Sequence, residues 1–309
     1  MENKNLTPAL AGLLILTLIW SYNWVVMKSV LQYMGALEFA ALRCLSGAAL
    51  LFLTLIIMRK RLAPPPLKPT LLVGLLQTAG MTGFTQLALI AGGAGKTAVI
   101  TYAMPFWVII LAAIVLKEKT TNIQKAAFAI AAAGLLFVIR PWDGQGGTVI
   151  SSLIALLAGI MWAGGSVVFK KVHNRKGIEL VNFTAWQMLV GAIILCVAAL
   201  VTHKEPITWN IHVFKALAYN AVLATALAWM LWLYILRTLP AGIAGLSTLL
   251  VPVLSVLFTW WRLGERPDIY QTIGVSLIVT ALLMISLPGI IKKRRGRKPK
   301  NKEIAPISV

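Results

Sequence analysis

The sequence predicts an all-α integral membrane protein with ten transmembrane helices arranged as two inverted five-helix repeats. Three observations predict this fold class: the composition, the number of long apolar runs, and a stretch that occurs twice. Of the 309 residues, 59% are hydrophobic and only 12% are charged. A soluble globular domain averages about 45–50% apolar and about 25% charged residues. We therefore expect the chain to lie within a lipid bilayer.

Ten apolar runs are each long enough to cross a membrane, because a transmembrane helix needs about 20 predominantly apolar residues. The first run is too long for a typical cleaved signal peptide, and no small-x-small cleavage site follows it. An even number of spans puts both chain termini on the same side. The ten runs are residues 8–28, 36–58, 70–92, 95–116, 123–140, 148–169, 178–201, 213–236, 240–263 and 267–290.

The stretch that occurs twice covers residues 94–118 and 241–265. In each copy Ala-Gly comes first, a proline follows ten residues after the glycine, and a glutamate follows thirteen residues after the proline. Pro105 and Pro252 each remove a backbone hydrogen bond from their helix. Inside a membrane such a break is tolerated mainly where it is buried in protein or faces a cavity. We therefore interpret the two copies as paired walls of one central pathway.

The whole chain also repeats with a period of about 145 residues. The segments IWSYNWVVMK and MWAGGSVVFK match at an offset of 142, and the two prolines match at an offset of 147. Five spans is an odd number, so the second unit enters the membrane upside down, as in many secondary transporters. We assign residues 1–140 to the first repeat, 148–290 to the second, and 291–309 to a basic tail.

The positive charge sets the orientation. Segments that face one side hold 21 Lys and Arg residues, and those that face the other hold seven, with Arg43 inside a span. The side richer in Lys and Arg is the cytoplasm. We therefore expect a multi-pass protein of the inner (cytoplasmic) membrane with both termini in the cytoplasm. The tail KKRRGRKPKNK is expected to contact anionic lipid, and the net charge of +20 does not indicate nucleic-acid binding.

These features resemble the drug/metabolite transporter superfamily, in its ten-helix EamA type. The resemblance rests on Trp20, Asn23 and Lys28 in the first span, on Glu38 and Arg43 at the start of the second, and on the duplicated Ala-Gly…Pro…Glu blocks. It covers residues 8–290. It implies a central cavity lined by spans 1–4 and 6–9, with spans 5 and 10 at the periphery. It also implies export of amino acids or related metabolites in many members.

Polar and aromatic residues inside apolar spans are the candidate substrate contacts. Trp20, Asn23 and Trp24 share one helix face, and they either line a pocket or mark the bilayer interface. Tyr102 lies beside the predicted break in span 4, whereas the polar residues of span 3 either line the site or join helices. The expected substrate-binding set is Trp20, Asn23, Trp24, Gln86, Thr101, Tyr102, Pro105, Trp162, Ser166, Trp229, Trp232, Ser247, Thr248 and Pro252.

Charged residues are informative mainly by their positions. None of the nine carboxylates lies at mid-span, although a buried carboxylate is the usual proton relay of pumps. Lys28, Glu38 and Arg43 gather near the outer face and are expected to act as gating or structural charges. Arg43 either contacts a substrate carboxylate or pairs with Glu38.

The sequence offers no signal for an enzyme. The three histidines are scattered in loops and cannot share a metal, and the Gly-rich stretch at residues 92–97 lacks the spacing of a P-loop. We expect no catalytic residue, metal or cofactor. The predicted function is a secondary transporter that exports small metabolites by alternating access. Drug or other organic-solute efflux and a non-enzymatic channel are the alternatives, and a homodimer is left open.

Overall fold

The computed structural model describes residues 6–143, 146–176, 179–202, 206–238 and 246–294. Among these residues every regular element is helical. The first repeat contains α1 (Leu6–Ser29), α2 (Ala36–Ile57), α3 (Leu67–Val73), α4 (Met81–Ala91), α5 (Ala94–Thr101), α6 (Met104–Val115) and α7 (Asn122–Ile139). The second contains α8 (Gly146–Lys176), α9 (Leu180–Thr202), α10 (Ile211–Ala218), α11 (Ala228–Thr238), α13 (Leu246–Leu263) and α14 (Ile269–Arg294).

These helices form the predicted spans. In the described part of the chain, nine helical segments are long and apolar enough to cross a membrane, and Leu249–Leu263 is a shorter apolar helix at the ninth predicted position. Span 3 is built from α3, a π-helix (Gly74–Gly80) and α4, and span 8 from α10, a π-helix (Tyr219–Leu227) and α11. The all-helical ten-span fold class is therefore confirmed.

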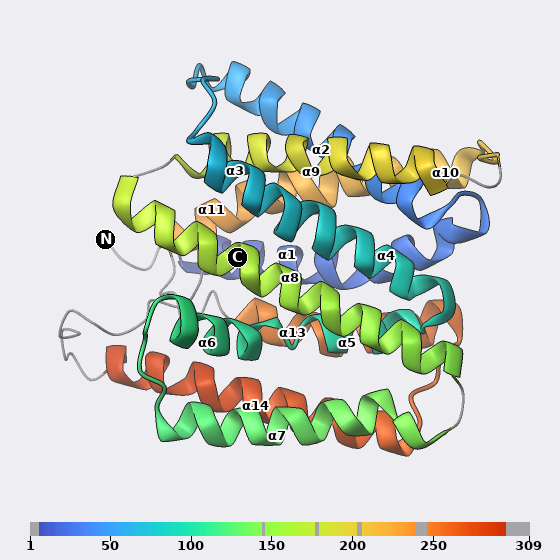
Figure 1. The fold of residues 1–309 in the computed structure, drawn as a ribbon, viewed down its shortest axis with the longest axis vertical. Coiled ribbons are helices and arrows are strands. Elements are labelled where there is room, and N and C mark those ends of the chain that lie inside the picture. The colour runs from blue at the N-terminus through green and yellow to red at the C-terminus, as the bar shows by residue number, and fades with distance from the viewer. Residues whose placement is uncertain (1–5, 144–145, 177–178, 203–205, 239–245, 295–309) are drawn as a thin grey trace.

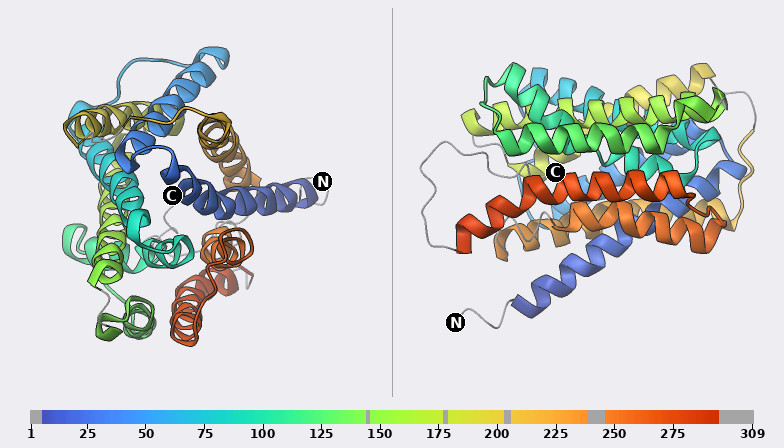
Figure 2. Two further views of the ribbon diagram at one scale, coloured as in Figure 1. Left: turned by 90° about the vertical axis from the view of Figure 1, so that its right-hand side faces the viewer. Right: turned by 90° about the horizontal axis from the view of Figure 1, so that it is seen from below.

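The bundle has two outer helix pairs with the remaining helices between them (Figure 1). Helices α2 and α9 pack together at one edge, and α7 and α14 pack together at the opposite edge. Seen along the helices, the α7–α14 pair is set apart from the rest of the bundle (Figure 2, left). Spans 5 and 10 are thus peripheral, as the family resemblance implies.

Glycine permits the closest of these helix contacts. A Cβ added to Gly134 in α7 would lie 2.8 Å from the Gly274 carbonyl oxygen, and one added to Gly274 in α14 would lie 2.6 Å from the Gly134 oxygen. Only a residue without Cβ allows this approach, and small residues at helix crossings are the usual means of close packing in membranes. The α7–α14 pair is therefore held by direct backbone contact.

Two π-helical segments occupy equivalent places in the two repeats, because their first residues, Gly74 and Tyr219, are 145 positions apart. Each packs against a glycine of the opposite repeat. A Cβ on Gly191 in α9 would lie 2.3 Å from the Thr78 Cβ, and one on Gly47 in α2 would lie 3.1 Å from the Thr225 Cγ2. The sequence did not predict these segments, which in other proteins occur frequently at functional sites.

The two prolines act differently on their helices. In span 4, α5 ends at Thr101 and α6 begins at Met104, with Pro105 in its first turn. In span 9, α13 continues without interruption through Pro252. The predicted break is thus confirmed at Pro105 and is wrong at Pro252.

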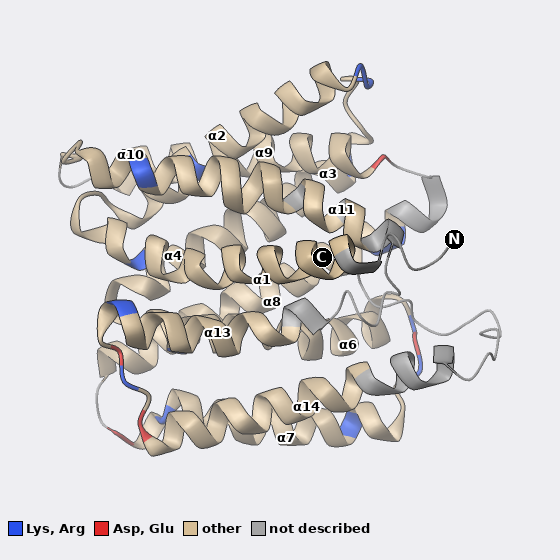
Figure 3. Ribbon diagram, turned by 180° about the vertical axis from the view of Figure 1, so that it is seen from behind, with Lys and Arg blue, Asp and Glu red and all other residues tan. Residues whose placement is uncertain are grey.

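Charged residues gather at the two ends of the bundle, and the middle is almost free of them (Figure 3). This distribution is the one expected of a protein whose middle lies in hydrocarbon, where unpaired charges are costly. The basic tail lies mostly outside the described residues, so its contact with lipid stays a prediction.

Candidate functional site

Three aromatic side chains from three helices form the centre of the candidate site. Trp24 of α1 and Trp162 of α8 both pack against Tyr102, which lies in the break between α5 and α6. The ring centroids of Tyr102 and Trp24 are 6.3 Å apart, and those of Tyr102 and Trp162 are 5.4 Å apart, both edge-on. We call Trp24, Tyr102 and Trp162 the aromatic triad. It joins helices of both repeats.

All three triad side chains are almost fully buried, at 3%, 9% and 7% exposure for Trp24, Tyr102 and Trp162. A lipid-interface anchor would be exposed at the protein surface, so burial argues against that interpretation of Trp24, and its place in a substrate pocket stays a prediction. The break in span 4 is what brings Tyr102 to this place, because Tyr102 follows the last residue of α5.

A second aromatic pair lies beside the triad. Trp20 of α1 packs against Trp232 of α11, with ring centroids 6.1 Å apart. The Trp20 Nε1 donates a hydrogen bond to the Ala224 carbonyl oxygen at 3.3 Å, inside the second π-helix. Trp20 and Trp24 thus contact different helices, although they share one face of α1.

Buried amide groups with unpaired polar atoms lie on α1, α4 and the second π-helix. Asn23 in α1 is 7% exposed, and Gln86 in α4 and Asn220 in the second π-helix are fully buried. The Asn23 Oδ1, both polar atoms of the Gln86 amide, and the Asn220 Oδ1 have no hydrogen-bond partner among the described residues. Leaving a buried polar group unpaired costs roughly 1–3 kcal/mol. A bound solute with its own donors and acceptors would remove that cost.

The predicted hydroxyls mostly satisfy helix backbone. The Thr101 Oγ1 lies 3.5 Å from the Ala155 carbonyl oxygen of α8, and the Ser166 Oγ donates to the Trp162 carbonyl oxygen at 2.9 Å. These contacts join helices or turns, so the structure places Thr101 and Ser166 beside the triad as supports. The side chains of Trp229, Ser247 and Thr248 lie outside the described part of the chain.

The glutamate at the end of one duplicated block caps the helix that begins the other block, a contact that the sequence analysis did not predict. The glutamate of the second copy, Glu265, accepts hydrogen bonds from the backbone amides of Ala94 at 2.9 Å and Gly95 at 3.1 Å. These two residues begin the first copy and also begin α5. Free amides and the helix dipole both favour a carboxylate at that end. One copy therefore caps the helix of the other, while Ala241 and Gly242 lie outside the described residues.

Of the predicted gating charges, Lys28 has the clearest partners. Its Nζ donates to the carbonyl oxygens of Leu89, Ile90 and Gly92 at 2.5, 3.3 and 3.1 Å, at the end of α4. The Arg43 Nη1 lies 2.7 Å from the Met27 Sδ. The choice between a substrate contact and a Glu38 pair for Arg43 stays a prediction.

A pocket of about 330 Å³ opens at the same end of the bundle. Both polar and apolar side chains surround it, and two of them are oppositely charged. It is lined by Lys28, Ser29, Leu31, Gln32, Ile90, Leu263 and Glu265.

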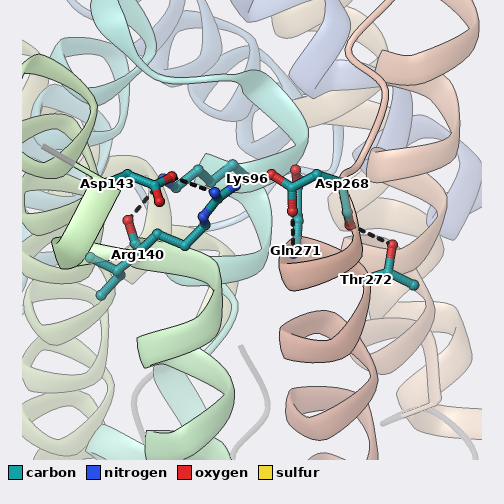
Figure 4. Close-up of polar contacts among 7 residues, drawn as sticks. Lys96, Arg140, Asp143, Asp268, Gln271 and Thr272 are labelled. Atoms are coloured by element: carbon teal, nitrogen blue, oxygen red, sulfur yellow. Dashed lines mark hydrogen bonds and ion pairs between the residues drawn. The ribbon is translucent and has the colours of Figure 1, made fainter. Parts of the chain in front are cut away.

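A polar network at this end ties α5, α7 and α14 together (Figure 4). The Arg140 guanidinium pairs with Asp143 at 2.7 Å and with Asp268, and it lies 4.6 Å over the Tyr270 ring. The Lys96 Nζ donates to the Ile139 carbonyl oxygen at 3.2 Å. The network lies on the peripheral pair, away from the aromatic triad, so we assign it a structural role.

Comparison with known proteins agrees with this architecture. A model of the EamA-like transporter family matches residues 7–140 and 149–287. The chain is 30% identical to "Uncharacterized transporter YoaV" of Bacillus subtilis, over 90% of this chain and 97% of that protein. It is 28% identical to a "Probable amino-acid metabolite efflux pump" of Salmonella typhimurium, over 92% and 96%.

Two further matches add to this. The chain is 24% identical to "Uncharacterized inner membrane transporter YedA" of Escherichia coli (strain K12), over 93% of both proteins. A solved crystal structure with 17% identity has a TM-score of 0.65 and covers 94% of this chain and 99% of its own. At that identity the likeness concerns the fold alone.

Proposed function

The chain belongs to the EamA-like transporter family, and from this premise we propose that it exports small metabolites, chiefly amino acids or related compounds, by alternating access. It is a multi-pass membrane transporter with a small-molecule substrate. The cargo, the direction of transport, the inner membrane as its location and the cytoplasmic position of both termini belong to the proposal.

The observation that carries the proposal is the aromatic triad at the break of span 4. Trp24, Tyr102 and Trp162 come from three helices and both repeats, and the site of a carrier with inverted repeats lies where the repeats meet. Broken helices mark such sites because irregular backbone at membrane depth is tolerated only where it is buried in protein or lines a cavity. The unpaired amides of Asn23 and Gln86 add hydrogen-bonding capacity to an otherwise apolar surrounding.

Two other observations support the cargo and the orientation of the chain in the membrane. Relatives from two enterobacteria carry the name "Probable amino-acid metabolite efflux pump", each at 28% identity. The lysine and arginine residues are concentrated on the predicted cytoplasmic side. A bulky organic solute is the second candidate, because aromatic side chains also stack on organic cations.

Metabolite profiling of the culture medium tests export. Cells that overexpress the wild-type chain are compared with cells that express Trp24→Ala or Trp162→Ala, with protein in the membrane measured in each. We expect the wild type to accumulate one class of compound, and each variant to export it at least about tenfold more slowly, because an aromatic contact and its buried area are lost. Trp261→Ala is the matched control, since that tryptophan is 72% exposed.

The outcomes separate the parts of the proposal. Equal export by both triad variants would keep the transporter and reject the triad as its site. No accumulation with any well-inserted chain would reject export. A channel would conduct the same compound without stimulation by substrate on the opposite side, whereas a carrier shows counterflow.

A further inference from the structure

Each repeat contributes one lysine and one glutamate at helix ends, and the inverted topology pairs them across repeats. Lys28 lies in the last turn of α1, and Lys170 lies in the C-terminal part of α8, which continues to Lys176; Glu118 and Glu265 follow the ends of α6 and α13. Helix α1 packs against α13, and α8 packs against α6. Lys28 and Glu265 therefore lie at one end of the bundle, and Lys170 and Glu118 at the other.

The pair at the Lys170 end is closed. The Lys170 Nζ lies 2.9 Å from the Glu118 Oε1, with side-chain exposures of 18% and 26%. This contact joins α8 to the segment that follows α6, and α6 itself packs against α8. Because both side chains are largely shielded from solvent, the attraction is screened less than that of a surface pair.

The equivalent groups at the Lys28 end form no ion pair among the described residues. The Lys28 ammonium donates to three carbonyl oxygens at the end of α4, and the Glu265 carboxylate accepts the amides of Ala94 and Gly95. Both charged groups line the pocket of about 330 Å³, together with Ile90 and Leu263. One end of the molecule therefore holds a formed lysine–glutamate ion pair, and the other holds the same two charged groups around a pocket.

We infer that Lys170–Glu118 and Lys28–Glu265 are two alternating end gates, and that this structure is the state closed at the Lys170 end and open at the Lys28 end. The inference rests on the proposed alternating access. In the opposite state Lys28 leaves the α4 carbonyls and joins Glu265, while Lys170 separates from Glu118. A carboxylate has about four acceptor positions, so Glu265 can receive Lys28 and keep its two amides.

Gates of the same chemistry suit a carrier for an energetic reason. A ligand shifts an equilibrium between two states only by its difference in affinity for them, so states far apart in energy cannot be exchanged by a small solute. Breaking one lysine–glutamate pair while forming another keeps the free energies of the two states similar. Removing one pair should therefore move the population in a direction set by which pair was lost.

The test measures accessibility rather than transport. Leu31→Cys, in the pocket at the Lys28 end, is placed in a Cys44→Ala, Cys196→Ala chain and labelled with a membrane-impermeant maleimide from each side. We expect Lys170→Met to slow labelling by roughly fivefold, since the pair that holds the Lys28 end open is lost. Lys28→Met should leave labelling unchanged or faster. Lys171→Met, which removes the exposed neighbouring charge, is the matched control.

A charge swap guards against simple misfolding. Lys170→Glu alone should slow labelling, and Lys170→Glu with Glu118→Lys should restore it. Three outcomes would overturn the gates. Labelling could slow equally in Lys170→Met and Lys28→Met, it could stay unchanged in Lys170→Met, or it could fail to recover in the charge swap. The labelling needs no substrate, so its result does not depend on which cargo is proposed. Normal counterflow together with an unchanged labelling rate would reject the gates and leave the proposed transport function intact.

Discussion

Spans 4 and 9 carry the same sequence marks and have different structures. Span 4 is interrupted between Thr101 and Met104, whereas span 9 runs through Pro252 as one helix. A proline removes one hydrogen bond in both places, so proline alone does not determine whether a helix breaks. The helices that pack against the two spans also differ.

The neighbour of span 4 leaves room for a displaced carbonyl. A Cβ added to Gly159 in α8 would lie 3.0 Å from the Thr101 carbonyl oxygen, the group that lacks its usual donor because of Pro105. The equivalent of Gly159 in the first repeat, 142 residues earlier, is the buried Thr17. Instead, α1 and α13 are joined by hydroxyls: the Ser21 Oγ donates to the Val251 carbonyl oxygen at 3.3 Å.

The aromatic triad follows the same asymmetry. The equivalents of Trp24 and Tyr102 in the other repeat are Ser166 and the buried Leu249, at offsets of 142 and 147. An inverted repeat can thus keep a symmetric frame although only one of its two proline positions interrupts a helix and carries the aromatic triad. Variants at these helix contacts test the difference between the two spans.

Tyr102→Leu gives span 4 the residue of span 9 and should have the largest effect. It removes two ring contacts, each contributing about 0.5–1.5 kcal/mol beyond area burial, so we expect transport to fall at least about tenfold in counterflow measurements on reconstituted protein. Leu250→Ala, at a residue that is 48% exposed, is the control. Unchanged transport by Tyr102→Leu would remove Tyr102 from the site.

Gly159→Ala should disturb span 4 through its neighbour. The new Cβ would lie 3.0 Å from a backbone oxygen that cannot rotate away, and overpacking of this kind costs about 1–3 kcal/mol. Thermal unfolding in detergent measures the loss. Gly164→Ala on the same helix is the matched control, because its nearest contact is the Leu76 side chain at 3.5 Å. Equal melting temperatures for the two variants would contradict the role of Gly159.

Pro105→Ala and Pro252→Ala compare the two prolines directly. Alanine at 105 restores an amide donor for the Thr101 carbonyl and favours a continuous helix, so we expect transport to fall several-fold with insertion preserved. The change at 252 should have the smaller effect, because α13 is already continuous. Surface labelling measures the insertion of both variants, and counterflow measures their transport. Normal transport by well-inserted Pro105→Ala would reject the break as a hinge.

Ser21→Ala should have the smallest effect. It removes one hydroxyl contact between α1 and α13, and interhelical hydrogen bonds in membranes contribute about 0.6 kcal/mol on average. We expect a small fall in melting temperature and near-normal transport. Ser46→Ala is the control, since its hydroxyl donates within α2, to the carbonyl oxygens of Leu42 and Arg43. A large loss of transport in Ser21→Ala would indicate that the α1–α13 contact takes part in the site.

The membrane class, the ten spans and their inverted duplication were predictable from the amino-acid sequence. The family resemblance added the peripheral place of spans 5 and 10. These features are local or periodic: the bilayer demands about 20 apolar residues per span, and a fixed offset is visible in the chain. Trp24, Tyr102 and Trp162 were among the predicted contacts because aromatic and polar residues inside apolar runs stand out.

Which of those residues contact one another became visible in the folded helix bundle. Trp20 and Trp24 share a helix face, yet one contacts Trp232 and the other Tyr102. The π-helices, the Glu265 cap and the closed Lys170–Glu118 pair likewise join residues far apart in the chain. Lipid is as apolar as leucine, so helix contacts depend on small residues and polar groups at a few facing positions, and no local pattern records which positions face each other.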